Sequence, residues 1–437
     1  MQGESVQGQG TSVRLSVAIP VALLGSWATA LLRYALPLYF AARSLPNSAW
    51  ETWSFYSLPA WIVAAPVAGV LGHRVGERRL WSASLAAGAL LSLWLIFLPF
   101  SDRWPVGIVG VGALVMSATA ASNWVAGVSL FQTVPARSRG WSNSAMLAAY
   151  GVGAILGPIL GSLLLRWSAG PQIPVAADFF PILGVFAGMA ALCALAMFRW
   201  GERGNRGAAP AGAQGPPSSS RHRNLRLLRS ARYLSLVIPL SLLAGPIFTA
   251  NNAYLVYRAH EPRIGLIVGS QDRGWGALQI VSFAAQLAGS LVLVPLAGRK
   301  ISVHRAAVFV ALFALACLGI GLAPGARLLF LSAAVFEVGR QFTRWVQTGY
   351  VSEHFTDSER TLVIAFSVSL SCTGSFAFML VMKAVQSPDA PGFHSALPFF
   401  VAAGIGLAGA ALLSLRRETL ASPTETPDDR AGLPGAG

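Results

Sequence analysis

The ten residues FEVGRQFTRW, 336–345, place Glu337, Arg340 and Arg344 between segments that are almost wholly apolar. At 100° per residue, the three charges and Gln341 fall in one sector of a helix. A charge at the centre of a bilayer costs about 2.5–3.5 kcal/mol on insertion scales, so these groups need water, partners or protein around them. Guanidinium groups bind carboxylates and phosphates through paired N–H donors and stay charged when desolvated. This stripe of polar side chains, Glu337, Arg340, Gln341 and Arg344, therefore predicts a polar surface that recognises an acidic group.

The segments around this stripe predict an all-α polytopic membrane protein. Of the 437 residues, 54% are hydrophobic and only 11% are charged. The apolar runs are long enough to cross a hydrocarbon core of ~30 Å as helices, which leave no backbone group unsatisfied in lipid. We expect about twelve spans, at approximately 15–40, 52–72, 80–100, 105–131, 142–166, 179–199, 233–257, 274–297, 303–323, 327–350, 361–385 and 394–415.

A Gly/Pro/Ser/Arg segment without apolar periodicity divides the spans six to six, and it is expected to be a flexible linker whose arginines either are solvated or rest on anionic headgroups. Lys and Arg are concentrated in the connections on the side of the two termini, which predicts that both termini lie in the cytoplasm. We expect the protein to lie in the plasma (inner) membrane. The expected parts are a cytoplasmic tail at 1–14, a six-helix bundle at 15–199, a cytoplasmic linker at 200–232, a second bundle at 233–416 and a disordered cytoplasmic tail at 417–437.

A weak internal repeat relates the two halves. NWVAGVSLFQTVPARSRG, 123–140, aligns with RWVQTGYVSEHFTDSERT, 344–361, and the alignment superposes Trp124 on Trp345 and Arg139 on Arg360. Each segment is the end of the fourth span of its half together with the following loop. Parallel six-span repeats of this kind build the two halves of one large class of transporters.

Two motifs in the expected positions give the chain a resemblance to the major facilitator superfamily over nearly its whole length. GVLGHRVGERRL, 69–80, resembles the signature loop between spans 2 and 3, and GVGAILGPILG, 151–161, resembles the span-5 motif GxxxGPxxG. The positions that match the loop motif are Gly69, Arg74, Gly76 and Arg78, and His73 is a position that differs from it. The positions that match the span-5 motif are Gly153, Gly157, Pro158 and Gly161.

The resemblance implies a cycle of alternating access, and it also exposes a departure. The family usually has an aspartate where this chain has His73 and a basic residue where it has Glu77, so the contacts that close the cytoplasmic side are in doubt. In the family the span-5 motif is associated with antiporters that export solutes. Small residues four apart that bring helices together, and a helix bent at proline, are a complete alternative explanation for that motif.

In the family, spans 1, 4, 7 and 10 line a central cavity, and the unusual polar residues of this chain lie in those spans. We expect an organic anion, or a zwitterion with an exposed acidic group, to offset the excess positive charge there. Glu337 is the candidate proton-coupling residue. The candidate substrate-binding residues are Arg33, Asn123, Asn251, Asn252, Arg340, Gln341 and Arg344. Alternatively, Arg340 only pairs with Glu337, Arg33 and Arg344 extend to the membrane surfaces, and the asparagines bond helix to helix.

The remaining residues suggest no other chemistry. Cys193, Cys317 and Cys372 lie inside apolar runs, the six histidines are scattered, and motifs of zinc proteases, serine hydrolases or P-loop ATPases are absent. We expect no enzyme activity, no cofactor, no metal and no nucleic-acid partner. We expect a monomer that lies in the lipid bilayer and binds protons and a small-molecule substrate. The leading hypothesis is proton-coupled export by antiport. The alternatives are an uptake symporter for an organic anion and a receptor or scaffold that kept the fold without transport.

Overall fold

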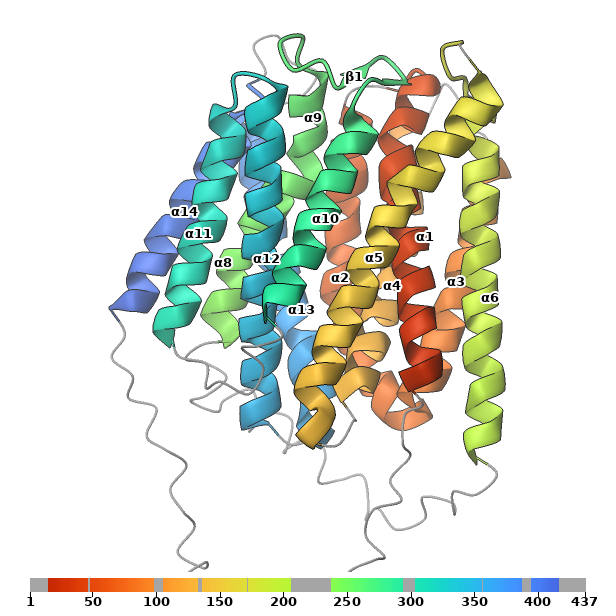
Figure 1. Ribbon diagram of the computed structural model, residues 1–437, viewed down its shortest axis with the longest axis vertical. Coiled ribbons are helices and arrows are strands. Elements are labelled where there is room, and N and C mark those ends of the chain that lie inside the picture. Colours follow the sequence, from red (N-terminus) through yellow and green to blue (C-terminus); the bar gives the residue numbers. More distant parts are fainter. Residues whose placement is uncertain are drawn as a thin grey trace, which may run out of the picture.

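The helices run side by side along the long axis of the molecule (Figure 1). The structure is a computed structural model and describes residues 15–45, 48–97, 105–132, 136–170, 172–205, 237–293, 303–355, 357–386 and 394–415. The first six spans are α1 Leu15–Ala42, α2 Ser48–Val75, α3 Glu77–Phe97, α4 Pro105–Gln132, α5 Ala136–Ala169 and α6 Phe180–Asn205, with the short helix η1 Ala176–Phe179 before α6. The seventh consists of α8 Ile238–Thr249, η4 Ala250–Tyr254 and α9 Leu255–His260. The last five are α10 Trp275–Leu293, α11 Val303–Leu322, α12 Ala326–His354, α13 Asp357–Val385 and α14 Leu397–Ser414.

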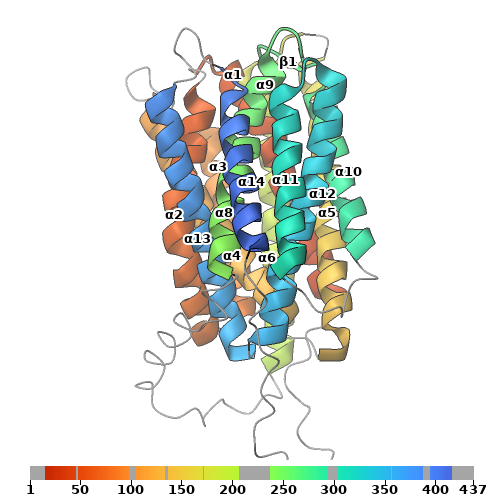
Figure 2. The same ribbon diagram turned by 90° about the vertical axis from the view of Figure 1, so that its left-hand side faces the viewer.

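These spans form two groups of six, which confirms the predicted fold class. Helices α1 to α6 gather on one side, and α8 to α14 gather on the other (Figure 1). The groups meet where α5 packs on α10 and where α2 packs on α13, as Figure 2 shows for the second pair. The predicted tails at 1–14 and 417–437 and most of the linker at 200–232 lie outside the described residues, although α6 continues to Asn205, beyond the expected end of its span.

Nine helices of the described chain are long and apolar enough to cross a membrane. The other spans miss that criterion for visible reasons. Helix α3 begins with the charged residues of the signature loop, α12 contains the charged stripe, and the seventh span is interrupted by η4. The interruption is a π-helical turn of five residues, a feature that occurs mostly at functional sites.

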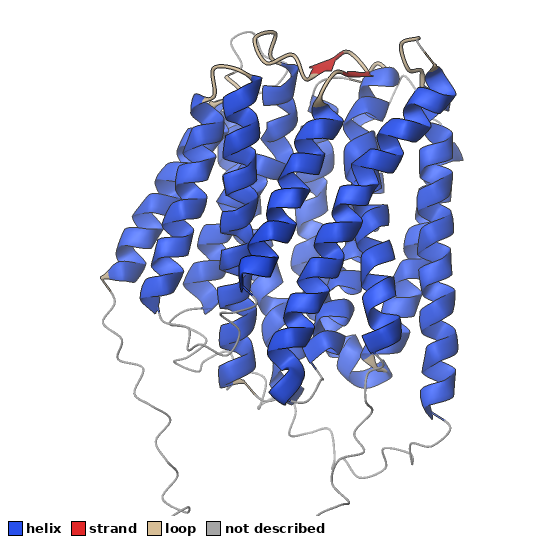
Figure 3. Cartoon of the chain, viewed as in Figure 1, coloured by secondary structure: helices blue, strands red, loops and turns tan. Residues whose placement is uncertain are grey.

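A small hairpin covers one end of the molecule. Strands β1 Ile267–Val268 and β2 Gln271–Asp272 pair antiparallel between α9 and α10 (Figure 3). The end that carries the hairpin is also where α1 ends and α2 begins (Figure 1). If both termini lie in the cytoplasm, as the charge pattern predicts, this end faces the opposite side of the membrane.

The span-5 motif brings α5 against α1. A Cβ on Gly153 would lie 2.2 Å from the Leu23 carbonyl oxygen, and one on Gly157 would lie 2.6 Å from the Leu31 backbone nitrogen. A Cβ on Gly161 would lie 2.5 Å from the Tyr34 ring. The glycines therefore allow backbone-to-backbone contact, which is the packing explanation of the motif.

The second half repeats this contact between α8 and α13. A Cβ on Gly245 would lie 2.2 Å from the Ser371 carbonyl oxygen, and one on Gly374 would lie 2.6 Å from the Leu242 carbonyl oxygen. The Ser375 hydroxyl donates to the Gly245 carbonyl oxygen at 2.9 Å. In each half the first and fifth spans thus touch through glycines, as the parallel repeat requires.

The signature loop forms the tight turn between α2 and α3. Gly76 has φ +89°, a left-handed conformation that glycine adopts without strain. Seven residues earlier, about two helical turns, a Cβ on Gly69 would lie 2.7 Å from the Ala365 Cβ, so this glycine lets α2 approach α13 of the other half. Arg74 is exposed and Arg78 is half-buried, while the His73 side chain lies outside the described part of the chain.

We expect Gly153→Ala to destabilise the fold, because its methyl group would collide with the α1 backbone and force α1 and α5 apart. Overpacking of this kind costs about 1–3 kcal/mol. Gly184→Ala on α6 is the matched control, because nothing lies within 4 Å of the added Cβ. Thermal unfolding of purified protein in detergent measures both. Equal melting temperatures for the two variants would contradict the packing role.

Candidate functional site

A cavity of about 540 Å³ lies between the two groups of helices. Its walls come from α1, α2, α4, the seventh span, α12 and α13, with smaller contributions from α3, α5 and α6. Spans 1, 4, 7 and 10 line it as expected. Helices α2 and α13 contribute as well, although the sequence did not single them out.

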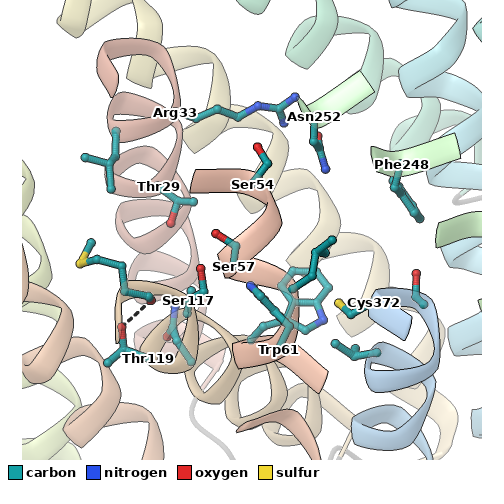
Figure 4. Close-up of a pocket in the computed structure, with 18 of the residues that line it drawn as sticks. Thr29, Arg33, Ser54, Ser57, Trp61, Ser117, Thr119, Phe248, Asn252 and Cys372 are labelled. Carbon is teal, nitrogen blue, oxygen red and sulfur yellow. Dashed lines mark hydrogen bonds between the residues drawn. The ribbon is translucent and has the colours of Figure 1, made fainter. Parts of the chain in front are cut away.

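Five of the predicted binding residues line this cavity: Arg33, Asn123, Asn252, Arg340 and Arg344. They come from four helices that are distant in sequence, and the fold brings them to one space. In Figure 4 the side chains of Arg33 and Asn252 point toward one another at one end of the view, and Trp61 lies at the other. The cavity therefore contains three guanidinium groups.

The other three predicted residues are buried beside the cavity and do not line it. Asn251 is 3% exposed, Glu337 is 1% exposed and Gln341 is fully buried. Glu337 forms an ion pair with Arg340 one helical turn away. The Asn251 side-chain amide donates to Glu337 Oε1 at 3.4 Å. Glu337 thus acts on the cavity through Arg340, which belongs to both environments.

Helix α10 supplies the far side of this buried polar cluster. Arg340 Nη2 donates to Gln286 Oε1 at 2.7 Å. Gln286 belongs to a buried stripe with Gln279, Ser282 and Ser290, at spacings of three and four residues. The stripe was visible in the sequence as a polar face on an apolar helix, but we did not single it out.

Aromatic rings hold two of the arginines. The Arg344 guanidinium lies over the Trp124 ring at 5.1 Å and over the Phe248 ring at 5.7 Å, and the Arg33 guanidinium lies over the Phe283 ring at 5.8 Å. Cation–π contacts of this kind contribute about 0.5–2 kcal/mol. They fix the guanidinium planes, whose N–H donors point outward in the plane.

Hydrogen bonds between the two groups of helices gather at the hairpin end. The Tyr34 hydroxyl donates to Asp272 at 2.7 Å, and the Trp275 indole N–H donates to the Tyr34 carbonyl oxygen at 3.3 Å. The Tyr254 hydroxyl donates to Glu51 at 2.8 Å. Glu51 is a buried carboxylate, 2% exposed, near the start of α2. The sequence did not single out this residue.

Trp50 lies at this joined end and separates two spaces. Its indole N–H donates to the Asn252 carbonyl oxygen at 3.2 Å. It lines the central cavity and also a second cavity of about 700 Å³, which is bordered by Tyr257, His260 and His394 among others. The tryptophan therefore forms part of the partition between the central cavity and the hairpin end.

A family model described as the Major Facilitator Superfamily matches residues 18–378. Among curated proteins there is no significant match.

Solved structures resemble the whole chain at low sequence identity. A variant of the Escherichia coli fucose:proton symporter FucP has a TM-score of 0.61 and 14% identity, over 92% of this chain and 98% of that one. FucP in its outward conformation has a TM-score of 0.63 and 17% identity, over 92% and 99%. The human organic anion transporter MFSD10 (TETRAN) has a TM-score of 0.63 and 17% identity, over 91% and 98%. At these identities the resemblance shows the fold alone.

We expect a small, water-soluble methanethiosulfonate reagent to modify Cys372 faster than the other two cysteines. Cys372 lines the central cavity, whereas Cys193 and Cys317 are buried in helix packing. Mass spectrometry of the labelled protein identifies the modified site, and Cys372→Ser is the control that should stay unlabelled. Equal labelling of Cys193 or Cys317 would mean that reagent does not reach the protein through this cavity.

Proposed function

The chain belongs to the major facilitator superfamily and is a secondary transporter, and from this premise we propose that it carries small organic anions in a proton-coupled cycle. Zwitterions with an exposed acidic group are included. The proposed site is the central cavity between the two groups of helices.

The observation that carries this proposal is the charge of the cavity wall. Three guanidinium groups, from Arg33, Arg340 and Arg344, line it, and its lining within the described chain includes no carboxylate. Glu337 offsets one positive charge from behind the wall. The positive side chains of this described lining attract an anion, and a planar guanidinium fork binds a carboxylate through two parallel hydrogen bonds.

One of the neighbours in fold is described with a substrate of this charge class. The human protein with this fold is described as an organic anion transporter, and FucP is described as a fucose:proton symporter. Those descriptions belong to proteins at most 17% identical to this chain. Cavity charge therefore remains the main argument.

The ion pair between Glu337 and Arg340 determines whether a bound proton strengthens or weakens anion binding. Glu337 faces Arg340 on its own helix, Asn251 on η4 and, through Arg340, Gln286 on α10. The charges of Arg33 and Arg344 also interact with it. A proton on Glu337 removes its attraction for Arg340 and adds one positive charge to the cavity region. Proton and anion therefore bind cooperatively, each strengthening the binding of the other.

Cooperative binding favours symport, in which proton and anion cross together and an inward proton gradient drives uptake. Antiport requires the two ligands to exclude one another, which this charge arrangement does not provide for an anion. Export by antiport, the leading hypothesis from the sequence and the span-5 motif, becomes the second candidate on this argument. Its glycines have a full explanation in the contact between α1 and α5.

We expect Arg344→Gln to weaken binding and transport of organic anions about tenfold or more, because a hydrogen bond to a charged group contributes about 1.5–3 kcal/mol. Arg327→Gln is the matched control, since Arg327 is an exposed arginine at the other end of α12. Uptake of radiolabelled carboxylates into proteoliposomes measures transport. Equal uptake by the two variants would remove Arg344 from the site.

We expect Glu337→Gln to abolish proton-driven accumulation while passive exchange of the anion continues. The neutral amide imitates the protonated carboxyl group, so anion affinity should stay high and lose its increase as pH falls. Proteoliposomes with an imposed pH gradient test this in both directions. Accumulation of the anion along the pH gradient by the variant would reject Glu337 as the coupling group. Exchange of protons for anions by the native protein would favour antiport. Native protein that binds anions without moving them would favour a receptor.

A further inference from the structure

Three tryptophans of α2, together with Trp124 of α4, give the cavity a large aromatic surface in addition to its cationic one. Trp50, Trp53 and Trp61 lie on one face of α2, at spacings of three and eight residues, and all three line the cavity. Phe186 on α6 and Phe248 on α8 add further rings. A small hydrophilic anion would bind the arginines and leave these rings in contact with water. A ligand with an apolar body would cover them.

Aromatic walls select for flat, rigid ligands. Ring contacts in offset or edge-on geometry add about 0.5–1.5 kcal/mol beyond the area that they bury. The arginines fit the same selection, because those stacked on Trp124, Phe248 and Phe283 are already held among rings. A ring system joined to an acidic group would contact both kinds of wall at once.

The hydroxyl groups of the wall indicate what the ring should carry. Ser57 and Thr29 donate their own protons to backbone carbonyl oxygens, at 2.7 Å to Trp53 and 2.9 Å to Gly25. Their lone pairs are then available to accept a hydrogen bond from a ligand. In Figure 4 both hydroxyls lie in the space between Arg33 and Trp61.

Asn123 strengthens this indication. Its side-chain oxygen Oδ1 is buried without a hydrogen-bond partner, and the residue lines the cavity. A buried acceptor without a partner costs about 1–3 kcal/mol, which a ligand donor would recover. The wall thus offers acceptors to the body of the ligand and donors to its acidic group.

We propose that the transported anion is an aromatic carboxylate that carries a hydroxyl or N–H donor on its ring system. This rests on the proposed function, since it specifies which organic anion the cavity selects. The carboxylate binds the arginines of α1 and α12, the ring packs against the α2 tryptophans, and the donor binds the hydroxyl and amide oxygens. A cavity of about 540 Å³ is within the usual range for a ligand of this size.

A series of five compounds separates the three requirements. 4-Hydroxyphenylacetate has the ring, the donor and the negative charge. Phenylacetate lacks the donor, acetate lacks both the ring and the donor, 4-hydroxyphenylacetamide lacks the charge, and tyramine carries a positive charge instead. Affinities for the purified protein come from thermal stabilisation and calorimetry. We expect 4-hydroxyphenylacetate to bind most tightly, phenylacetate several-fold more weakly, and the other three much more weakly.

The outcomes distinguish this inference from the function on which it rests. If acetate binds as tightly as 4-hydroxyphenylacetate, the carrier is an anion transporter without aromatic selectivity, and the inference is overturned. If phenylacetate equals 4-hydroxyphenylacetate, the donor requirement is overturned. If tyramine binds most tightly, or if no anion binds, the proposed function fails as well.

Variants of Trp61 test the aromatic wall directly. We expect Trp61→Leu to weaken binding of 4-hydroxyphenylacetate by about two- to tenfold, as the loss of a ring contact implies, and to leave the affinity for acetate unchanged. Trp61→Phe keeps a ring and should restore most of the affinity, which separates ring contact from misfolding. Trp167→Leu, at an exposed tryptophan of α5, is the control. Equal losses for 4-hydroxyphenylacetate and acetate, or no loss in Trp61→Leu, would contradict the proposal.

Discussion

The ion pair between Glu337 and Arg340 determines the electrostatics of the whole central region. Removing one partner of a buried pair leaves an uncompensated charge, which costs about 3–5 kcal/mol. The structure surrounds this pair with amides, from Gln286 on α10 and Asn251 on η4. Arg340 reaches the cavity and Glu337 does not, so a change of protonation behind the wall alters the charge that a ligand meets.

Close backbone contacts at glycines join two helices within each half. Glycines bring α5 onto α1 in the first half and α13 onto α8 in the second, so each half has a tightly joined pair of helices. The two halves meet along α2 with α13 and α5 with α10, where Gly69 permits the approach to Ala365. A movement of one half against the other would leave each of these pairs intact and would change only the contacts between halves.

The hairpin end contains several hydrogen bonds between the two halves. The bonds from Tyr34 to Asp272 and from Tyr254 to Glu51 join the halves there, and Trp50 separates the central cavity from the second one. The π-helical turn of η4 lies directly below, with Asn252 bonded through its carbonyl oxygen to Trp50. The ligand cavity and the joined end thus share one irregular segment of the seventh span.

Sequence alone determined the class of the fold, because apolar length and charge asymmetry are local properties that lipid imposes on every span. It also identified Arg33, Asn123, Asn252, Arg340 and Arg344 as unusual, since charged and amide groups are costly within a membrane. The sequence could not tell which residues of the α12 stripe line the cavity, as Arg340 and Arg344 do, and which are buried beside it, as Glu337 and Gln341 are. Whether Glu337 faces the cavity or is buried against Asn251 depends on helix rotation and on partners more than 50 residues away, which only tertiary packing decides.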